Sequence, residues 1–403
     1  MARPPRGGAE PIDGLGPGRA GGGQRPRVAI DYTPAVTQGG GIGRYTRGLV
    51  AALIEHADRG AFDLRLVLAR DAGLDRLPPL PEGVSLCRLP LPSVWMSRIW
   101  HRLRLPLAAD RLIGGCELYH APDYVLPPLA RAQGLVTVHD LSFLTYPEGA
   151  VPALARYLGR AVPRSVARAD RVLADSESTR RDLERLLGLA PDRVTVVGAG
   201  VEARFRPLVD RGQRLAARQR LGLPERFVLG LGTLEPRKNF VGLIQAFERC
   251  AERVPDLHLV IAGGQGWLFE PILEAAASSP HAARIHLLGF VDDAELPSLY
   301  GLAESFAFPS FYEGFGIPVL EAMACGTPVV VADNSSLPEL AGDAALRVPT
   351  GDSAALATAL LRLSEDPELR LRHARLGPIQ ASRFAWPAAA DRLVEVYRGL
   401  LQR

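Results

Sequence analysis

Apolar residues recur along this chain as short runs that alternate with helical periodicities. Runs at 27–31, 64–68, 84–89, 117–120, 135–139, 171–174 and 194–197 predict buried strands, and stretches at 153–166 and 178–187 predict helices. Strands that alternate with helices indicate a parallel sheet covered by helices on both faces. Ligands bind such sheets beyond the carboxyl ends of the strands, so the residues after each run are candidates for chemistry.

The same alternation begins again after a charged, weakly patterned segment. Strands are predicted at 227–231, 257–262, 285–288, 305–308, 328–331 and 345–348, with helices near 240–253, 268–277, 294–302, 317–324, 354–363 and 368–376. We therefore predict two similar α/β domains that face each other across a cleft. Their bounds are 27–206 and 225–385, with a linker region at 207–224 and an amphipathic C-terminal helix at 386–403.

The composition describes a globular protein whose N-terminus differs from the rest. Residues 1–26 are rich in Gly, Pro and Arg and have no apolar core of a signal peptide, so we predict a disordered tail. No apolar run approaches the roughly 18 residues of a membrane helix. The four cysteines are scattered without metal-ligand spacing. A cytoplasmic protein with no disulfide and no metal site is the expectation.

Charge is unevenly distributed between the two halves. The first 220 residues carry a net charge of +10 and the remainder −7. The basic half either meets phosphate or anionic lipid, or is a solvated arginine-rich surface. Residues 94–105, with two tryptophans and three arginines, fit a half-buried helix, which is the simpler interpretation, or a surface that enters a membrane interface. Peripheral contact with an anionic membrane is therefore considered, and no nucleic-acid partner is expected.

Two features of the first half lie where a ligand would bind. The glycine cluster at 39–43 joins the first strand to a helix, as in a nucleotide-binding βαβ unit. It matches the G-x-G-x-x-G pattern poorly, so a flexible surface loop remains the alternative. His120 and His139 stand at strand ends, where either a structural or a functional role is open.

The stretch 309–331 carries a pair of carboxylates around one short helix. Pro318 suits the first helical position and Gly326 suits the residue after the last turn. Glu313 then precedes the helix and Glu321 lies near its start. The free N–H groups of that helix start favour an anion such as a diphosphate. The two carboxylates would hold different hydroxyls of one anionic ligand.

A second phosphate candidate follows the first strand of the second domain, in the sequence GLGTLEPRKN. Arg237 offers a forked contact and Lys238, the only lysine of the chain, offers a point charge. An Arg-Lys pair in a loop is often solvated surface. Here it lies at the ligand edge of the sheet, which predicts a diphosphate site.

Taken together, these motifs resemble the family 4 retaining glycosyltransferases. The resemblance rests on GGGIGRYTRGL, VHDLSF, DSESTRRDL, VVGAGVEARFRP, GTLEPRKN, PSFYEGFGIPVLEAMACGTPVV and SSLPELAGDAA, in the order expected for the family. It spans the chain from Arg27 to the C-terminus and includes the E-x7-E pair formed by Glu313 and Glu321. The resemblance implies the GT-B fold, with two Rossmann-like domains and a C-terminal helix that packs back towards the first domain. Its details are most similar to a bacterial mannosyltransferase branch.

The resemblance implies roles for residues on both sides of the cleft. Gly40 and Gly41 would let the first-domain loop approach the donor phosphate. His139 would contact the transferred sugar near the reacting carbon. Arg237 and Lys238 would bind the diphosphate and stabilise its charge as it leaves.

The glutamate pair and its helix take the remaining implied roles. Glu313 would bind sugar hydroxyls together with backbone N–H groups of Phe315, Gly316 and Ile317. Glu321 would bind the ribose hydroxyls.

One departure concerns the phosphate site. Many family members carry an arginine where this chain has Thr233. The phosphate charge then rests more heavily on Arg237.

The implied reaction is transfer of a hexosyl group from a nucleoside-diphosphate sugar to a hydroxyl of a glycan or lipid-linked acceptor. A mannosyl group is the first choice. GDP-mannose is the first choice of donor, no cofactor is expected, and no D-x-D metal motif occurs. UDP- or ADP-sugars and a nucleotide-sugar epimerase of the same fold remain alternatives. A glycosidase with two catalytic carboxyls is a rival interpretation, but a phosphate site argues against it. An inactive sugar-nucleotide-binding subunit is another, and the full set of motifs argues against that. The protein would work in the cytoplasm, with possible placement at the inner face of the membrane.

Overall fold

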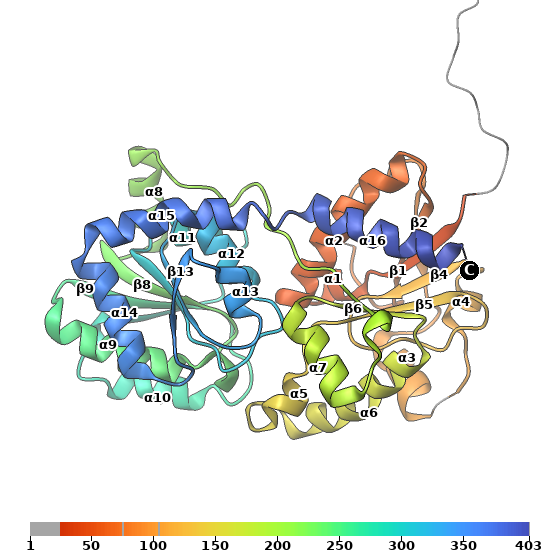
Figure 1. The fold of residues 1–403 in the computed structure, drawn as a ribbon, viewed down its shortest axis with the longest axis horizontal. Coiled ribbons are helices and arrows are strands. Elements are labelled where there is room, and N and C mark those ends of the chain that lie inside the picture. The colour runs from red at the N-terminus through yellow and green to blue at the C-terminus, as the bar shows by residue number, and fades with distance from the viewer. Residues whose placement is uncertain (1–24, 75, 104, 403) are drawn as a thin grey trace, which may run out of the picture.

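The computed structural model describes residues 25–74, 76–103 and 105–402. The expected disordered tail at 1–26 therefore lies almost entirely outside the described residues. Figure 1 shows two α/β lobes side by side, joined by a crossing segment and by a long C-terminal helix. Within the described residues, no helix is both long enough and apolar enough to cross a bilayer.

The first lobe is a parallel sheet with the strand order β3-β2-β1-β4-β5-β6-β7. Its strands are β1 (Arg27–Asp31), β2 (Asp63–Leu68), β3 (Val84–Arg88), β4 (Leu118–Ala121), β5 (Gln133–Val138), β6 (Arg171–Ala174) and β7 (Val194–Val196). Its helices are α1 (Thr33–Thr37), α2 (Gly41–Asp58), α3 (Ser93–Ser97), α4 (Ala109–Leu112), α5 (Ser142–Thr145), α6 (Pro152–Arg168) and α7 (Glu177–Leu187). The central strands are buried on both faces because helices cover both, which explains their continuous apolar sequences.

The second lobe repeats this plan with the order β10-β9-β8-β11-β12-β13. Its strands are β8 (Arg226–Leu231), β9 (Leu257–Ala262), β10 (Ile285–Gly289), β11 (Ser305–Phe308), β12 (Val329–Ala332) and β13 (Ala345–Val348). Its helices are α9 (Phe240–Arg253), α10 (Glu270–Ser278), α11 (Leu296–Leu302), α12 (Ile317–Ala324), α13 (Leu337–Ala341), α14 (Ser353–Glu365) and α15 (Pro367–Ala381). In both sheets the strand order reverses beside the first strand, and this is where a doubly wound fold binds its ligands.

The last helix, α16 (Trp386–Leu401), returns to the first lobe and packs on α2. Its apolar side, including Trp386 and Tyr397, joins the core of the first sheet. Tyr397 and His120 share a hydrogen bond of 2.9 Å between the phenol oxygen and Nδ1. His120 is fully buried and does not line the central cavity. Of the two roles that the sequence left open for His120, the structural one therefore applies.

Two segments have more local structure than their sequences suggested. The expected linker region at 207–224 contains α8 (Arg211–Leu221), which packs against α11. The helix expected within 94–105 reaches only Arg102, because α3 (Ser93–Ser97) continues directly into a π-helical turn at Arg98–Arg102. Val94 and Trp95 are more than half exposed there, while Met96 is buried in the core.

Candidate active site

A cavity of about 650 Å³ lies between the two lobes. Its walls are the loops that follow β1, β5, β8, β9, β10 and β11, together with the start of α12. The carboxyl ends of both sheets therefore open into one space, as expected for two facing doubly wound domains.

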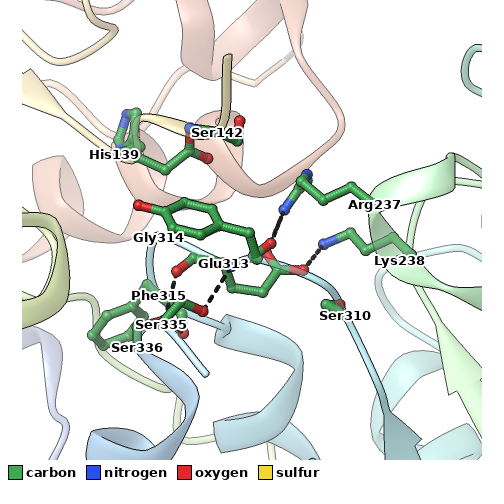
Figure 2. Close-up of polar contacts among 12 residues, drawn as sticks. His139, Ser142, Arg237, Lys238, Ser310, Glu313, Gly314, Phe315, Ser335 and Ser336 are labelled. Atoms are coloured by element: carbon green, nitrogen blue, oxygen red, sulfur yellow. Dashed lines mark hydrogen bonds and ion pairs between the residues drawn. The ribbon is translucent and has the colours of Figure 1, made fainter. Parts of the chain in front are cut away.

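Glu313 lies at the wall of this cavity and holds two cations (Figure 2). Its Oε1 accepts a hydrogen bond of 2.6 Å from Lys238 Nζ, and its Oε2 accepts one of 2.8 Å from Arg237 Nη1. The residue is only 6% exposed. Burial alone would raise the pKa of Glu313, but the charges of Arg237 and Lys238 outweigh it and lower this pKa to about 2. Glu313 is therefore ionised at neutral pH.

Arg237 is fixed by more than one partner. Its guanidinium donates to the backbone oxygen of Tyr312 at 2.9 Å and pairs with the buried carboxylate of Glu235. Burial would lower the pKa of Arg237, but Glu313 and Glu235 raise it overall. Lys238 Nζ lies 4.9 Å from the ring centre of Phe308. Both cations are held at the cavity wall before any ligand binds.

Serines of the SSLPEL motif support the loop that carries Glu313. The backbone N–H of Glu313 donates to Ser335 Oγ at 2.9 Å (Figure 2). Ser336 Oγ lies within hydrogen-bond distance of the backbone oxygens of Glu313 and Phe315 and shares its single proton between them. Gly316 then begins α12 with φ +120°, a conformation that L side chains rarely adopt. The loop and the helix start are fixed relative to each other.

His139 enters the cavity wall from the first lobe, and both of its ring nitrogens are engaged. Nδ1 lies 2.7 Å from Asp175 Oδ2, and Nε2 lies 2.7 Å from the backbone oxygen of Pro122. Both partners are acceptors, so the ring must donate twice as an imidazolium. Burial would lower the pKa of His139, but Asp175 and Asp123 raise it to about 9. In this arrangement both ring nitrogens are engaged by groups of the first lobe itself.

The glycine cluster lies at the opposite wall, at the start of α2. Gly40 caps this helix and Gly41 is its first residue, and a Cβ at either position would meet nothing within 4 Å. Both line the cavity. Gly43 is different because a Cβ there would lie 1.9 Å from the backbone oxygen of Gln38. Gly43 permits the turn, and its neighbours leave room for a ligand.

Glu321 is placed differently from Glu313. It lies in the second turn of α12, is 1% exposed and does not line the cavity. Arg44 of α2 forms an ion pair with it across the two lobes, and Tyr300 Oη donates to its Oε2 at 3.1 Å. Burial raises the pKa of Glu321 to about 7, although Arg44 and Tyr300 favour the ionised form. One cation here does not offset burial, whereas two do so at Glu313.

The structure thus brings together every site residue expected from sequence except Glu321. Three charged partners were missed: Arg44, Asp175 and Glu235. Asp175 and Glu235 lie inside the DSES and GTLEPRK motifs, which could have drawn attention to them. Arg44 follows the glycine cluster, but nothing local indicates that its partner is Glu321.

Comparison with known proteins bears on this geometry. The family described as "Glycosyltransferase Family 4" matches residues 39–205, and "Glycosyl transferases group 1" matches residues 213–377. An O-antigen chain mannosyltransferase B of Escherichia coli is 33% identical over 287 residues, which cover 70% of this chain and 74% of that protein. This chain belongs to the family 4 glycosyltransferases. The family assignment agrees with the resemblance drawn from the motifs.

Other relatives and solved structures extend the comparison. A D-inositol 3-phosphate glycosyltransferase of Saccharomonospora viridis is 36% identical over 246 residues, covering 58% of this glycosyltransferase and 56% of that protein. Sucrose-phosphate synthase of Thermosynechococcus elongatus superposes with a TM-score of 0.74 at 21% identity, covering 94% and 100% of the two chains. WaaG, a glycosyltransferase involved in lipopolysaccharide biosynthesis, gives 0.67 at 16% identity, covering 92% and 99%. These structures share the GT-B fold with this chain.

Proposed function

We propose that this glycosyltransferase moves a hexosyl group from a nucleoside-diphosphate sugar to a hydroxyl of a glycan or lipid-linked acceptor. Mannosyl is the first choice for the transferred group. The 33% identity to an O-antigen mannosyltransferase supports a mannosyl donor, with GDP-mannose as the first choice. Transfer proceeds with retention at the anomeric carbon and without a metal ion, as the family resemblance implies.

The observation that carries this proposal is the triad of Glu313, Arg237 and Lys238 at the cavity wall. Breaking the bond between sugar and phosphate builds negative charge on the departing diphosphate. Fixed cations and the N-terminus of α12 lower the barrier because they need no reorganisation when that charge appears. Arg237 and Lys238 take the diphosphate, and Glu313 aligns both cations and receives sugar hydroxyls.

The charge state of Glu313 bears on the glycosidase alternative. A glycosidase needs a carboxylic acid that stays protonated beside the scissile bond. Glu313 is ionised at neutral pH because two cations hold it. Glu321 has a higher pKa but lies outside the cavity. Both observations support ligand-holding roles, in which the departing phosphate accepts the proton of the acceptor hydroxyl.

The remaining parts of the proposal concern the nucleotide and the location of the enzyme. Glu321 would bind the ribose hydroxyls, which requires Arg44 to move away from it. We also propose that the enzyme works in the cytoplasm, where its first lobe makes peripheral contact with an anionic membrane. Residues 27–206, which span the first lobe, carry a net charge of +5, and this excess supports that contact.

A donor screen tests the function directly. Nucleotide release is measured with GDP-, UDP-, ADP- and dTDP-sugars, with and without a candidate acceptor. We expect release that depends on acceptor, is fastest with GDP-mannose and survives a metal chelator. Lys238→Ala should lower turnover by roughly 100- to 1000-fold because a fixed cation at the leaving group is lost.

The controls separate the alternatives. Arg347→Ala removes an exposed cation of the second lobe, 3.4 Å from Asp333, and should leave turnover unchanged. Preference for a UDP- or ADP-sugar would keep the enzyme class and overturn the choice of donor. Sugar interconversion without acceptor would indicate an epimerase. Near-normal turnover in Lys238→Ala would contradict the diphosphate site.

A further inference from the structure

Helix α6 carries arginines at intervals of four residues on its exposed side. Arg156, Arg160 and Arg164 are all exposed, and the segment 152–169 contains no Asp or Glu. Among the described residues, none of these three arginines forms a salt bridge. A basic helix face without acidic partners attracts anions more strongly than an ordinary mixed-charge surface.

The spacing places these arginines on one stripe of the helix. Residues four apart lie on the same face, so the three guanidinium groups project together. The opposite face packs into the core through Val162 and Val166, which are 0% and 1% exposed. α6 is therefore amphipathic, and its apolar side is already buried in the core of the first lobe. The stripe is left for a partner from outside.

Apolar side chains are exposed on the same layer of the first lobe. Figure 1 shows α3 and α6 on the face of the first sheet away from α2 and α16. Val94 and Trp95 of α3 are 56% and 53% exposed, and Leu103 and Leu105 are 64% and 50% exposed. Arg98 lies over the Trp95 ring at 5.2 Å. Arginine beside exposed aromatic and aliphatic side chains is typical of proteins that lie at a membrane interface.

The helix that carries the stripe also lines the cavity, with its other side. Leu154 and Leu158, one and two turns into α6, line the cavity, and Leu154 is also 42% exposed. Arg156 and Arg160 are each two positions along from these leucines, so they lie on roughly the opposite side of the same helix. A partner that contacts the stripe would therefore stand about one helix diameter, roughly 10 Å, from the cavity.

We propose that α6, with its stripe of Arg156, Arg160 and Arg164, and the exposed segment at Val94 and Trp95 form a docking surface for an anionic lipid bilayer. This inference rests on the proposed membrane contact of the enzyme and names the surface that makes it. A bilayer fits better than a soluble phosphate because it offers anionic headgroups and an apolar layer together. Docking there places the cavity about one helix diameter from the membrane that holds a lipid-linked acceptor.

Vesicle binding tests this surface. The protein is sedimented with phosphatidylcholine vesicles, with or without phosphatidylglycerol. We expect binding that needs phosphatidylglycerol and weakens as salt shortens the Debye length. Arg156→Gln/Arg160→Gln/Arg164→Gln should weaken partitioning by about 100-fold, because each arginine near an anionic surface contributes about fivefold. Val94→Ser/Trp95→Ser should remove the binding that persists at high salt.

A matched charge control uses three exposed arginines of the second lobe. Arg249→Gln/Arg372→Gln/Arg375→Gln makes the same change in net charge and should bind vesicles like the wild type. The proposal would be overturned if this control lost as much vesicle binding as the α6 variant, or if the α6 variant bound like the wild type. It would also be overturned if the wild type bound neutral and anionic vesicles equally. Binding to soluble dextran sulfate but not to vesicles would assign the stripe to an anionic glycan instead.

The readouts distinguish this surface from the proposed reaction. Vesicle binding does not require turnover, and transfer to a soluble acceptor does not require vesicles. Absent vesicle binding with intact transfer would overturn only the docking surface. Intact, arginine-dependent vesicle binding without any donor turnover would overturn only the proposed reaction.

Discussion

Two carboxylates eight positions apart on one loop and helix have opposite electrostatic settings. Glu313 contacts two cations and has a pKa lowered to about 2, whereas Glu321 contacts one and has a pKa raised to about 7. Burial disfavours the ionised form of both carboxyl groups. Only Glu313 has enough positive charge nearby to overcome that effect. Sequence predicted the pair and its spacing. It could not predict Arg44 as the partner of Glu321, because the two lie 277 positions apart.

We expect substitutions at the two glutamates to separate catalysis from nucleotide binding. Glu313→Gln should lower kcat by roughly 100-fold or more, with little effect on nucleotide affinity, because Arg237 and Lys238 lose the carboxylate that aligns them. Glu321→Gln should mainly raise the Kd for the nucleotide, since a hydroxyl acceptor is lost. Steady-state kinetics and calorimetric titration with the free nucleotide measure the two effects. Equal increases in Kd for both variants would contradict this division of roles.

The His139–Asp175 pair should make stability depend on pH. The pKa of His139 is raised from its ordinary value of 6.5 to about 9, so the folded protein binds this proton more tightly. Its contribution is fully present below pH 6.5 and is lost as pH rises through about 9. We expect the unfolding free energy of the wild type to fall across that range in urea titrations. Asp175→Asn removes the anion and should flatten this fall; an unchanged slope would mean that other groups cause it.

At the scale of elements, sequence was most accurate where the signals are local. The helix expected at 317–324 is found at Ile317–Ala324, because Pro318 and Gly326 mark its ends. The helix expected at 240–253 is also found with the same bounds. The helix expected within 94–105 is found from Ser93 to Arg102, but its geometry changes from α to π at Arg98. Its apolar residues are divided between core and solvent by neighbours that no local pattern reveals.

The attachment of α16 to the first lobe depends on a similarly distant contact. Tyr397 Oη shares a hydrogen bond with His120 Nδ1, and Thr137 Oγ1 lies 2.9 Å from its Nε2. Burial lowers the pKa of His120 to about 3, so the ring is neutral. We expect Tyr397→Phe to leave Nδ1 unsatisfied and to lower the unfolding free energy by about 1–3 kcal/mol. Urea unfolding, with hydrogen exchange of the α16 amides, measures this loss.

A matched control for this contact is Tyr45→Phe in α2. Tyr45 is 1% exposed, and within the described residues its hydroxyl makes no hydrogen bond of good geometry, although Thr137 lies close to it. Removing that oxygen should leave stability nearly unchanged or slightly higher, because no well-formed bond is broken. If both variants lose the same stability, the bond between Tyr397 and His120 does not hold α16 in place.

At the scale of the whole molecule, the two lobes are closed on the cavity by contacts from several sides. Tyr312 Oη donates to Asp182 Oδ2 at 2.6 Å, and Trp267 Nε1 donates to the backbone oxygen of Gly149 at 2.7 Å. Phe315 of the second lobe joins the hydrophobic core of the first. The loops of both sheets therefore meet around the site only in this closed arrangement. Neither lobe alone contains the complete cavity wall.

The tightest of these contacts is at Gly314, and it gives a direct test of closure. A Cβ at this position would lie 1.9 Å from the backbone oxygen of His139. Gly314→Ala should hold the lobes apart by more than 1 Å, while each lobe keeps its fold. We expect kcat/KM to fall by about 100-fold, since displacements of that size separate reacting groups. Kinetics and the distance between spin labels on the two lobes report activity and closure together.

The matched control is Gly159→Ala in the middle of α6. A Cβ there meets nothing within 4 Å, so activity should stay at the wild-type level. Stability should rise by up to about 1 kcal/mol because alanine is the better helix former. Full activity of Gly314→Ala with unchanged label distances would mean that the lobes tolerate the methyl group in the closed state. A longer distance with full activity would mean that catalysis does not require closure, and the cavity between the lobes would then not be the reacting geometry.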